Sequence, residues 1–182
     1  MPKKIFYFII PLTMLACNFL FPQSGPDNTS PQTPPEVAPV EGATPAPEYY
    51  STDTFTITRV NVQNGELLVQ LATETQKAKS LGQMPFIEFD ATWCPPCITI
   101  DNNIKAKEPL TTKAFEGVYL IRADVDEWGW GDGKAFNFEA IPIYYELNDD
   151  GTPSGSVIDG GAWNEDIPEN FAPVLDQFFH TP

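Results

Sequence analysis

The feature that most constrains this chain is a pair of cysteines, Cys94 and Cys97, separated by two prolines. The pair closely follows residues 85–89, a short apolar run typical of a buried strand, and it opens a stretch with isoleucines at helical spacing. The free N–H groups and positive partial charge of a helix N-terminus favour a thiolate over a thiol, and a thiolate attacks disulfides. We therefore expect redox chemistry here, with Cys94 attacking first and Cys97, shielded one turn further along the helix, acting second.

Three other uses of the cysteine pair remain open from the residues alone. A zinc site needs two further ligands, and the remaining candidates, Cys17 and His180, lie near opposite ends of the chain. Copper delivery needs His or Met near the pair, where Met84 is the one plausible helper. A purely structural disulfide closes a loop so short that it removes little entropy from the unfolded chain. We expect redox turnover, with no metal ion and no bound cofactor.

Strand-like and helix-like segments alternate from residue 52 onward. The predicted strands are residues 54–60, 85–89, 118–125, 143–147 and 154–158, and the predicted helices are residues 66–81, a helix from Cys94 towards Pro109, and a last helix through residues 167–178 that Asn164 caps. The turn sequence at residues 148–151 predicts a hairpin between the last two strands. Parallel crossovers followed by a hairpin predict an α/β fold whose mixed sheet is covered by helices.

The charge balance excludes whole classes of partner. The chain has 10 Lys and Arg against 25 Asp and Glu, a formal net charge of −15, and a single histidine. Phosphate backbones repel a chain this acidic, so we expect no nucleic-acid binding. Anionic lipid headgroups repel it as well, so any membrane attachment must be hydrophobic or covalent.

The N-terminus has the pattern of an export signal, in which two lysines precede an apolar run over residues 5–16. That run is too short to span a bilayer as a helix. The small residue before Cys17 resembles the lipobox of bacterial lipoproteins, which implies a signal peptide over residues 1–16 and a diacylglycerol on the Cys17 sulfur. An uncleaved anchor over residues 5–21 and ordinary secretion are the alternatives. All three place the folded domain outside the cytoplasm.

Residues 17–51 are predicted to be a tether. Prolines recur there among Ser, Thr, Ala and Glu, with no apolar periodicity that could support a packed core. Proline-rich segments favour extended polyproline II at about 3.1 Å per residue, enough to hold a domain tens of ångströms from a membrane. The folded domain is then residues 52–182.

Over roughly residues 53–180 the chain resembles the thioredoxin superfamily. Three motifs carry the resemblance: Trp93-Cys94-Pro95-Pro96-Cys97 after a buried strand, Ile141-Pro142 before another strand, and Gly160-Gly161 before the last helix. The resemblance implies a three-layer α/β/α fold with a mixed central sheet. Within the superfamily the chain is most similar to the membrane-tethered thiol–disulfide oxidoreductases of bacterial envelopes, including those that serve cytochrome c maturation.

The resemblance also assigns roles to individual residues. Cys94 matches the attacking cysteine, Cys97 the resolving cysteine, and Pro142 the cis-proline that lies against the pair. A cis bond there turns the backbone of Ile141 outward, ready to pair with an extended substrate. The implied substrate-binding residues are Trp93, Pro95, Pro96, Ala140, Ile141, Pro142 and Gly161.

Glu88, six residues before Cys94, stands where cytosolic thioredoxins have a buried acid. A buried carboxyl has a raised pKa and can take the proton from Cys97 through water, so we expect Glu88 to be catalytic. The alternative is a solvent-facing strand residue, because the alternation of residues 86–89 does not settle which face is buried. Arg122 matches a basic residue near this acid in relatives, which predicts a pair with Glu88; the alternative is a surface arginine.

Several features depart from the usual pattern of the superfamily. Pro95-Pro96 replaces the common Gly-Pro, so one N–H donor near the Cys94 sulfur is lost. No histidine lies between the cysteines, and Asp90 adds negative charge nearby. All three features leave the Cys94 thiolate less stabilised, which predicts a reductant or isomerase rather than an oxidant.

Residues 128–133 combine two tryptophans with three glycines, after the strand that ends near residue 125. Two interpretations remain open, a lip that binds a partner and side chains that pack over the adjacent helix.

We therefore expect an extracytoplasmic thiol–disulfide oxidoreductase that exchanges its Cys94–Cys97 dithiol or disulfide with protein substrates. Its partners are proteins with disulfides or thiols, an envelope electron donor that reduces the oxidised pair, and a membrane reached through the lipid on Cys17. The alternative is a non-catalytic envelope scaffold with the same fold and a fixed disulfide.

Overall fold

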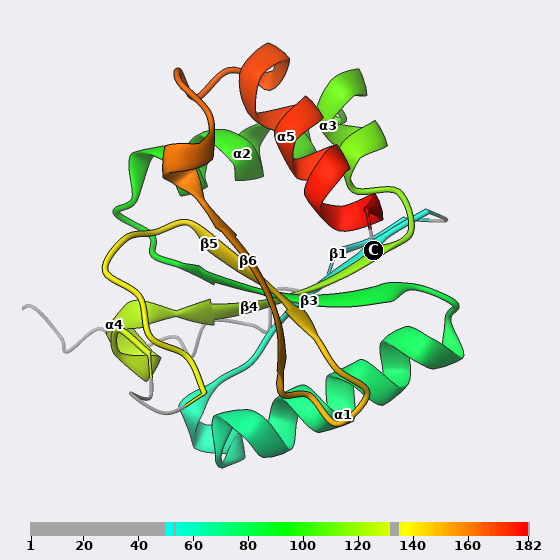
Figure 1. The fold of residues 1–182 in the computed structure, drawn as a ribbon, viewed down its shortest axis with the longest axis vertical. Helices are drawn as coiled ribbons and strands as arrows, with labels where there is room; N and C mark the ends of the chain where they lie inside the picture. Colours follow the sequence, from blue (N-terminus) through cyan, green and yellow to red (C-terminus); the bar gives the residue numbers. More distant parts are fainter. Residues whose placement is uncertain (1–49, 53, 132–134, 182) are drawn as a thin grey trace, which may run out of the picture. The chain divides into compact units, whose positions relative to one another are not determined.

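The computed structural model describes residues 50–52, 54–131 and 135–181 (Figure 1). The predicted signal peptide, the predicted lipidation site at Cys17 and the predicted tether up to residue 49 lie outside the described residues. Residues 50 and 51, at the end of the segment predicted as tether, form the first strand of the sheet.

Six strands form one mixed sheet in the order β1-β2-β4-β3-β5-β6. The strands are β1 (Tyr50–Ser51), β2 (Thr56–Arg59), β3 (Met84–Asp90), β4 (Val118–Asp124), β5 (Ile143–Leu147) and β6 (Pro153–Asp159). The central strands β2, β4 and β3 are parallel, whereas β1, β5 and β6 run antiparallel to their neighbours. The crossovers and the β5–β6 hairpin confirm the predicted α/β class with a mixed sheet.

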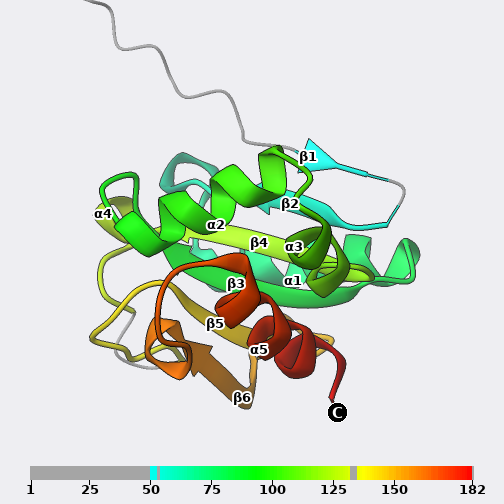
Figure 2. The ribbon, with the colours of Figure 1, turned by 90° about the horizontal axis from the view of Figure 1, so that it is seen from above.

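Helices cover both faces of the sheet, as Figures 1 and 2 show. The helices are α1 (Leu67–Ser80), α2 (Pro95–Lys105), α3 (Pro109–Ala114), α4 (Val125–Trp128) and α5 (Pro168–His180), with 3-10 turns η1 (Val62–Asn64) and η2 (Gly160–Ala162). Helix α1 lies on one face, and α2, α3 and α5 lie on the other. This is the three-layer arrangement that the resemblance implied.

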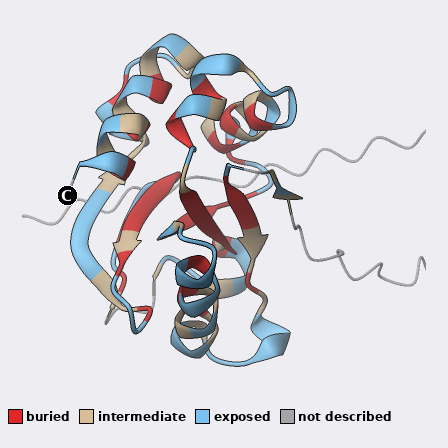
Figure 3. Ribbon diagram, turned by 90° about the vertical axis from the view of Figure 1, so that its right-hand side faces the viewer, coloured by how far each residue is buried: buried red, intermediate tan, exposed pale blue. Residues whose placement is uncertain are grey.

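The two faces of the sheet support two apolar cores. On the α1 side, Ile87 and Phe89 of β3 pack in one cluster with Leu71. On the other side, Phe86 packs in a second cluster with residues of α2, α3 and α5, Ile100 among them. Because helices cover both faces, β3 is buried along most of its length (Figure 3). Alternation therefore could not tell whether Glu88 is buried, since either face would bury it.

The helix predicted from Cys94 towards Pro109 is α2, which ends at Lys105, and a separate helix, α3, begins at Pro109. A residue before proline is restricted to extended backbone, and Glu108 accordingly has φ −60° and ψ 129°. The Glu108 carboxylate accepts hydrogen bonds from the N–H groups of Leu110 and Thr111, which caps α3. Lys107, at φ 55°, redirects the chain between the two helices.

The last helix also begins later than predicted. Ile167 occupies its N-cap position without a side-chain hydrogen bond, and Pro168 is its first residue. Asn164 does not cap it, so that prediction is wrong. The fixed φ of proline and its missing N–H suit the first helical position, which explains why α5 begins there.

Candidate active site

Cys94 and Cys97 lie where β3 ends and α2 begins, and their sulfurs form a disulfide with a Cα–Cα distance of 5.3 Å. Cys94 is the N-cap of α2, and Pro95 and Pro96 fill the first two helical positions. Those positions leave their N–H groups unpaired in any helix, so prolines fit there with little loss. The backbone N–H of Cys97 is then the first available donor of the helix, and it points at the Cys94 Sγ from 3.3 Å.

Both cysteines are buried in the disulfide form, Cys94 at 2% exposure and Cys97 at 5%. Cys97 is shielded as expected, but Cys94 is shielded as well, so burial does not distinguish the two sulfurs. The geometry that does distinguish them is the helix terminus, because the N–H of Cys97 points at the Cys94 sulfur.

The peptide bond between Ile141 and Pro142 is cis, as the resemblance implied. Pro142 is buried and lies against Gly160, where a Cβ atom would stand 3.3 Å from the proline Cδ. Ala140 and Gly161 are exposed and line a groove of about 540 Å³ beside this turn. Of the predicted substrate-binding residues, these contribute to a surface that a peptide could reach.

Trp93 is 53% exposed, and its Nε1 donates to the Asp126 carboxylate at 2.8 Å. Its ring lies 6.4 Å from that of Trp130, which is 47% exposed. Pro95 is exposed beside Trp93, and Pro96 is half-buried.

The two tryptophans of the 128–133 segment behave differently. Trp128 packs against the α1-side core and its Nε1 donates to the Val60 carbonyl at 3.4 Å. Trp130 instead lies at the surface beside Trp93. The packing interpretation therefore holds for Trp128, whereas partner binding by Trp130 stays a prediction. Residues 132 and 133 lie outside the described residues.

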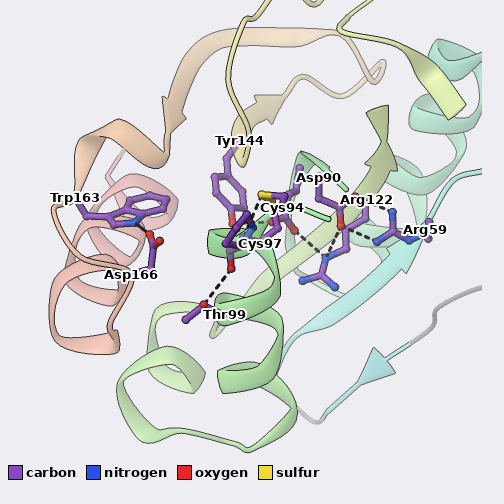
Figure 4. The surroundings of a disulfide bond; sticks show 11 residues. Arg59, Asp90, Cys94, Cys97, Thr99, Arg122, Tyr144, Trp163 and Asp166 are labelled. Carbon is purple, nitrogen blue, oxygen red and sulfur yellow. Dashed lines mark hydrogen bonds and ion pairs between the residues drawn. A yellow bond between two sulfur atoms is a disulfide. The ribbon is translucent and has the colours of Figure 1, made fainter. Parts of the chain in front are cut away.

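A row of polar side chains crosses the sheet beneath the disulfide, as Figure 4 shows in part. Arg59, Arg122, Glu88 and Tyr144 are register partners on β2, β4, β3 and β5, so they share one face. Arg122 Nε donates to Glu88 Oε2 at 2.8 Å, which confirms the predicted pair. Tyr144 donates its hydroxyl to Glu88 Oε1, also at 2.8 Å.

Glu88 is buried at 1% exposure, which excludes the solvent-facing alternative. Burial raises the pKa of Glu88 above its ordinary value of 4.5, against the opposing charge of Arg122. Burial and the neighbouring Glu88 raise the pKa of Tyr144 well above its usual value, so its hydroxyl stays a donor. A carboxyl with a raised pKa can exchange a proton at a higher pH than an ordinary glutamate.

Asp90 is two residues further along β3, and its charge is compensated. Both of its oxygens accept from the Arg59 guanidinium, at 2.8 and 2.7 Å. Arg122 also donates to Asp101 on α2 at 2.9 Å, and Lys105 pairs with the same carboxylate at 2.6 Å. The bidentate pair weakens one argument for a poorly stabilised Cys94 thiolate, because Asp90 does not present an unpaired negative charge.

A cavity of about 250 Å³ connects these charges with the resolving cysteine. Its lining includes Cys97, Asp90, Arg59, Arg122 and Asp101. Glu88 is not among the described residues that line it, but Arg122 lines the cavity and donates to the Glu88 carboxylate. The cavity gives Cys97 a polar path for a proton.

In the ranges 54–131 and 135–181, no cluster of three or more His, Cys, Asp and Glu is placed to hold a metal ion. No helix in that part of the chain is both long and apolar enough to cross a bilayer.

Comparison with known proteins identifies the family. An H-type thioredoxin of Oryza sativa subsp. indica is 33% identical over 91 residues, which are 50% of this chain and 68% of the relative. The chain belongs to the thioredoxin family. Thioredoxin H4 of Arabidopsis thaliana is 31% identical over 96 residues, which are 52% of this chain and 73% of that thioredoxin.

The chain is also similar to a solved structure, that of oxidised thioredoxin O1 from Arabidopsis thaliana, with 19% sequence identity. The match covers 68% of this chain and 97% of the thioredoxin O1 chain, with a TM-score of 0.40. No protein-family model matches the chain.

Sequence reasoning missed three residues beneath the disulfide: Arg59, Asp101 and Tyr144. A signal for Arg59 and Tyr144 was present, because both stand in predicted strands. Their convergence on Glu88 and Asp90 follows from strand order and register, which strand propensity does not encode.

Proposed function

We propose that this chain is a thiol–disulfide oxidoreductase that exchanges its Cys94–Cys97 pair with disulfides or thiols of protein substrates. The observation that carries the proposal is the bonded pair at the N-terminus of α2, beside cis-Pro142, in a chain of the thioredoxin family. The direction we propose is reduction or isomerisation. It is favoured by the two prolines without N–H groups and by the absence of histidine between the cysteines.

The cycle begins with the reduced chain. The Cys94 thiolate attacks a substrate disulfide, which forms a mixed disulfide and releases one substrate thiolate. Cys97 loses its proton and attacks the Cys94 sulfur, which releases the second substrate thiolate and closes the Cys94–Cys97 bond. The substrate gains two electrons and two protons, and the chain becomes oxidised. An electron donor of the same compartment must reduce it again.

Glu88 is the proposed proton acceptor for Cys97. Burial raises its pKa, and its carboxyl lies on the same face of the sheet as Phe86 and Tyr144, the face that α2 covers. The proton leaves Cys97 through water in the 250 Å³ cavity and reaches Glu88 through water. Arg122, which lines the cavity and donates to Glu88, stays protonated and does not relay the proton. Arg122 and Tyr144 hold the Glu88 carboxyl in place through one hydrogen bond to each oxygen.

Reduction of insulin tests the catalytic proposal. The parent chain should accelerate insulin reduction by a small dithiol, and both Cys94→Ser and Cys97→Ser should abolish the acceleration. No acceleration by the parent would support the second candidate, a scaffold with a fixed disulfide. Trapping with Cys97→Ala, which cannot resolve the mixed disulfide, should recover covalent complexes and identify the substrates.

The location is proposed separately. The short basic start, the apolar run over residues 5–16 and the small residue before Cys17 support export followed by lipidation. A full-length chain expressed in bacteria should incorporate labelled palmitate and sediment with membranes, and Cys17→Ala should do neither. Label retained in the Cys17→Ala chain would contradict lipidation at this residue.

A further inference from the structure

Basic residues are distributed very unevenly along the chain. Nine of the 10 Lys and Arg residues stand at or before Arg122, and Lys134 is the single one after it. The same C-terminal stretch, residues 123–182, contains 13 of the 25 acidic residues. Helix α4, the Ile141–Pro142 turn and η2 all belong to this stretch, and α4 itself contains Asp126 and Glu127.

Three acidic side chains lie next to the surface that a substrate would contact. Asp126 accepts the hydrogen bond from Trp93, and Glu139 and Asp159 line the 540 Å³ groove that Ala140 also lines. Asp126 and Glu139 are exposed, and Asp159 is half-buried. None of the three forms an ion pair with a described residue. We call Asp126, Glu139 and Asp159 the acidic rim.

An apolar platform lies within this rim. The Trp93 ring is 6.4 Å from Trp130, and the Trp130 ring is 6.1 Å from Phe138. Gly131, at φ +86°, lets the chain pass so closely that a Cβ there would stand 2.4 Å from the Phe136 carbonyl oxygen. The backbone that follows Trp130 therefore packs directly against the backbone of Phe136.

The positive charges near the disulfide are not available to a partner in the same way. Arg59 is paired with Asp90, Arg122 with Glu88 and Asp101, and Lys105 with Asp101. A negatively charged partner segment would therefore meet the unpaired acidic rim and no uncompensated cation among these residues. A positively charged segment would meet complementary charge and exposed indole faces, which attract Lys and Arg side chains.

We propose that the partner of this site is a polypeptide whose reacting cysteine stands among lysine or arginine residues. The inference rests on the proposed function and adds the chemical class of the substrate. The acidic rim attracts the basic residues, and Trp93 and Trp130 contact their side chains. Complementary charge of this kind raises association rates by about 10- to 1000-fold at low salt.

Two synthetic peptides test the inference. Both contain the same Cys-Gly-Ser-Cys disulfide, with two lysines on each side in one peptide and two glutamates on each side in the other. The reduced full-length chain is mixed with each peptide, and the rate of disulfide opening is followed by chromatography. Each rate is divided by the rate with neutral dithiothreitol, which corrects for the intrinsic reactivity of the peptide.

We expect the lysine peptide to react about tenfold faster than the glutamate peptide at low ionic strength, and the ratio to approach one in 1 M salt. The triple variant Asp126→Asn, Glu139→Gln, Asp159→Asn should bring the ratio close to one at low salt. The matched variant Glu116→Gln, Asp149→Asn, Asp176→Asn changes the net charge equally, at residues that do not border the groove or the tryptophans. This matched variant should have the same ratio of lysine-peptide to glutamate-peptide rates as the parent chain.

The outcomes separate the two proposals. Equal rates with both peptides would overturn the inference while leaving the redox function standing. Equal losses in the rim variant and the matched variant would overturn it too, because net charge rather than the acidic rim would then set the preference. If the chain opens neither peptide while dithiothreitol opens both, the proposed function fails and the inference fails with it.

Discussion

Two sets of charged side chains flank the Cys94–Cys97 bond, and they differ in how each charge is compensated. Beneath the disulfide, Glu88, Asp90 and Asp101 are all paired with cations at 2.6–2.9 Å. At the surface, the acidic rim has no ion-pair partner among the described residues. Burial accounts for the difference, because a buried charge without a partner is far more costly than an exposed one.

The comparison indicates that the two sets of charges have different roles. Paired, buried charges are held rigidly and can set the proton affinity of groups near the sulfurs. Unpaired, hydrated charges leave the sulfurs nearly unaffected, since water screens them, but they act on an approaching partner. Substitutions at four residues test whether the buried charges and the surface that contacts a partner have these different roles.

The largest effect is expected from Arg122→Met. Arg122 is buried at 2% exposure, and its loss leaves the Glu88 carboxylate without its cation and Asp101 with Lys105 alone. Removing one partner of a buried ion pair costs about 3–5 kcal/mol in the free energy of unfolding. Urea denaturation measures it. Lys79→Met breaks the exposed pair with Asp149 and should cost less than about 1 kcal/mol. Similar losses of unfolding free energy in both variants would show that the buried ion pairs stabilise the fold no more than an exposed pair does.

Tyr144→Phe should have the next largest effect. It removes the hydroxyl that donates to Glu88 Oε1, and a hydrogen bond to a charged group contributes about 1.5–3 kcal/mol. Because that bond lowers the pKa of Glu88, its loss should raise this pKa further. The neighbouring Tyr145→Phe removes a neutral hydrogen bond to the Asn137 carbonyl and should cost about 1 kcal/mol. Thermal or urea unfolding of the two variants gives the comparison, and an inverted order would contradict it.

Glu88→Gln should slow the reaction of the reduced chain with insulin about tenfold at neutral pH. This is less than the roughly 100-fold or more that is typical of a direct acid–base residue, because the proton passes through water. Stopped-flow rates between pH 5 and 9 should lose the ionisation that lies above 4.5 in the parent. Asp90→Asn is the matched control, because both Asp90 oxygens are occupied by one guanidinium. A larger loss in Asp90→Asn would assign the proton to the carboxylate that lines the cavity.

The substitution Glu88→Gln should also change how the free energy of unfolding depends on pH. The pKa of Glu88 is higher in the folded state than the ordinary value of 4.5, so the folded state binds more protons than the unfolded state as pH rises above 4.5. The contribution of Glu88 to the free energy of unfolding is therefore greatest at low pH and falls as pH rises through the folded pKa. Glu88→Gln should flatten that part of the stability curve, which chemical denaturation at several pH values will detect.

Trp130→Ala should have the smallest effect. The exposed ring contributes contact area to a partner, so its loss should raise the KM for insulin about threefold, within the range for a peripheral aromatic contact. The free energy of unfolding should change by less than about 1 kcal/mol, as for most surface sites. Val69→Ala removes a residue that is 62% exposed on α1 and should leave KM unchanged. An equal change of KM in both variants would show that Trp130 is not part of the binding surface.

Much of the fold was predictable because its signals are local. Residues 66–81 have helical periodicity and stop signals, and α1 spans Leu67–Ser80. The strand at Ile143–Leu147 was predicted with its observed bounds. Helix α3 was not predicted, because its six residues are too few to show helical periodicity.

The candidate site was predictable only where a motif spans a few residues. Cys94, Cys97 and the cis bond at Pro142 were found through such motifs. The Arg59–Asp90 pair joins residues 31 positions apart, and it depends on β2 and β3 both flanking β4. Strand order is a property of the whole chain, so no window of sequence around either residue contains it.

Strand β1 has a mechanical consequence. It is two residues long, lies at one edge of the sheet, and attaches there through Tyr50 opposite Ile57 and Ser51 opposite Thr56 (Figure 2). Tension applied to the chain before Tyr50 would act first on this short ladder. Strands β2 and β4 lie between it and β3, which leads to the disulfide. A force strong enough to detach β1 would therefore break hydrogen bonds at the edge of the sheet. Strands β2 and β4 would still separate that break from β3 and the disulfide.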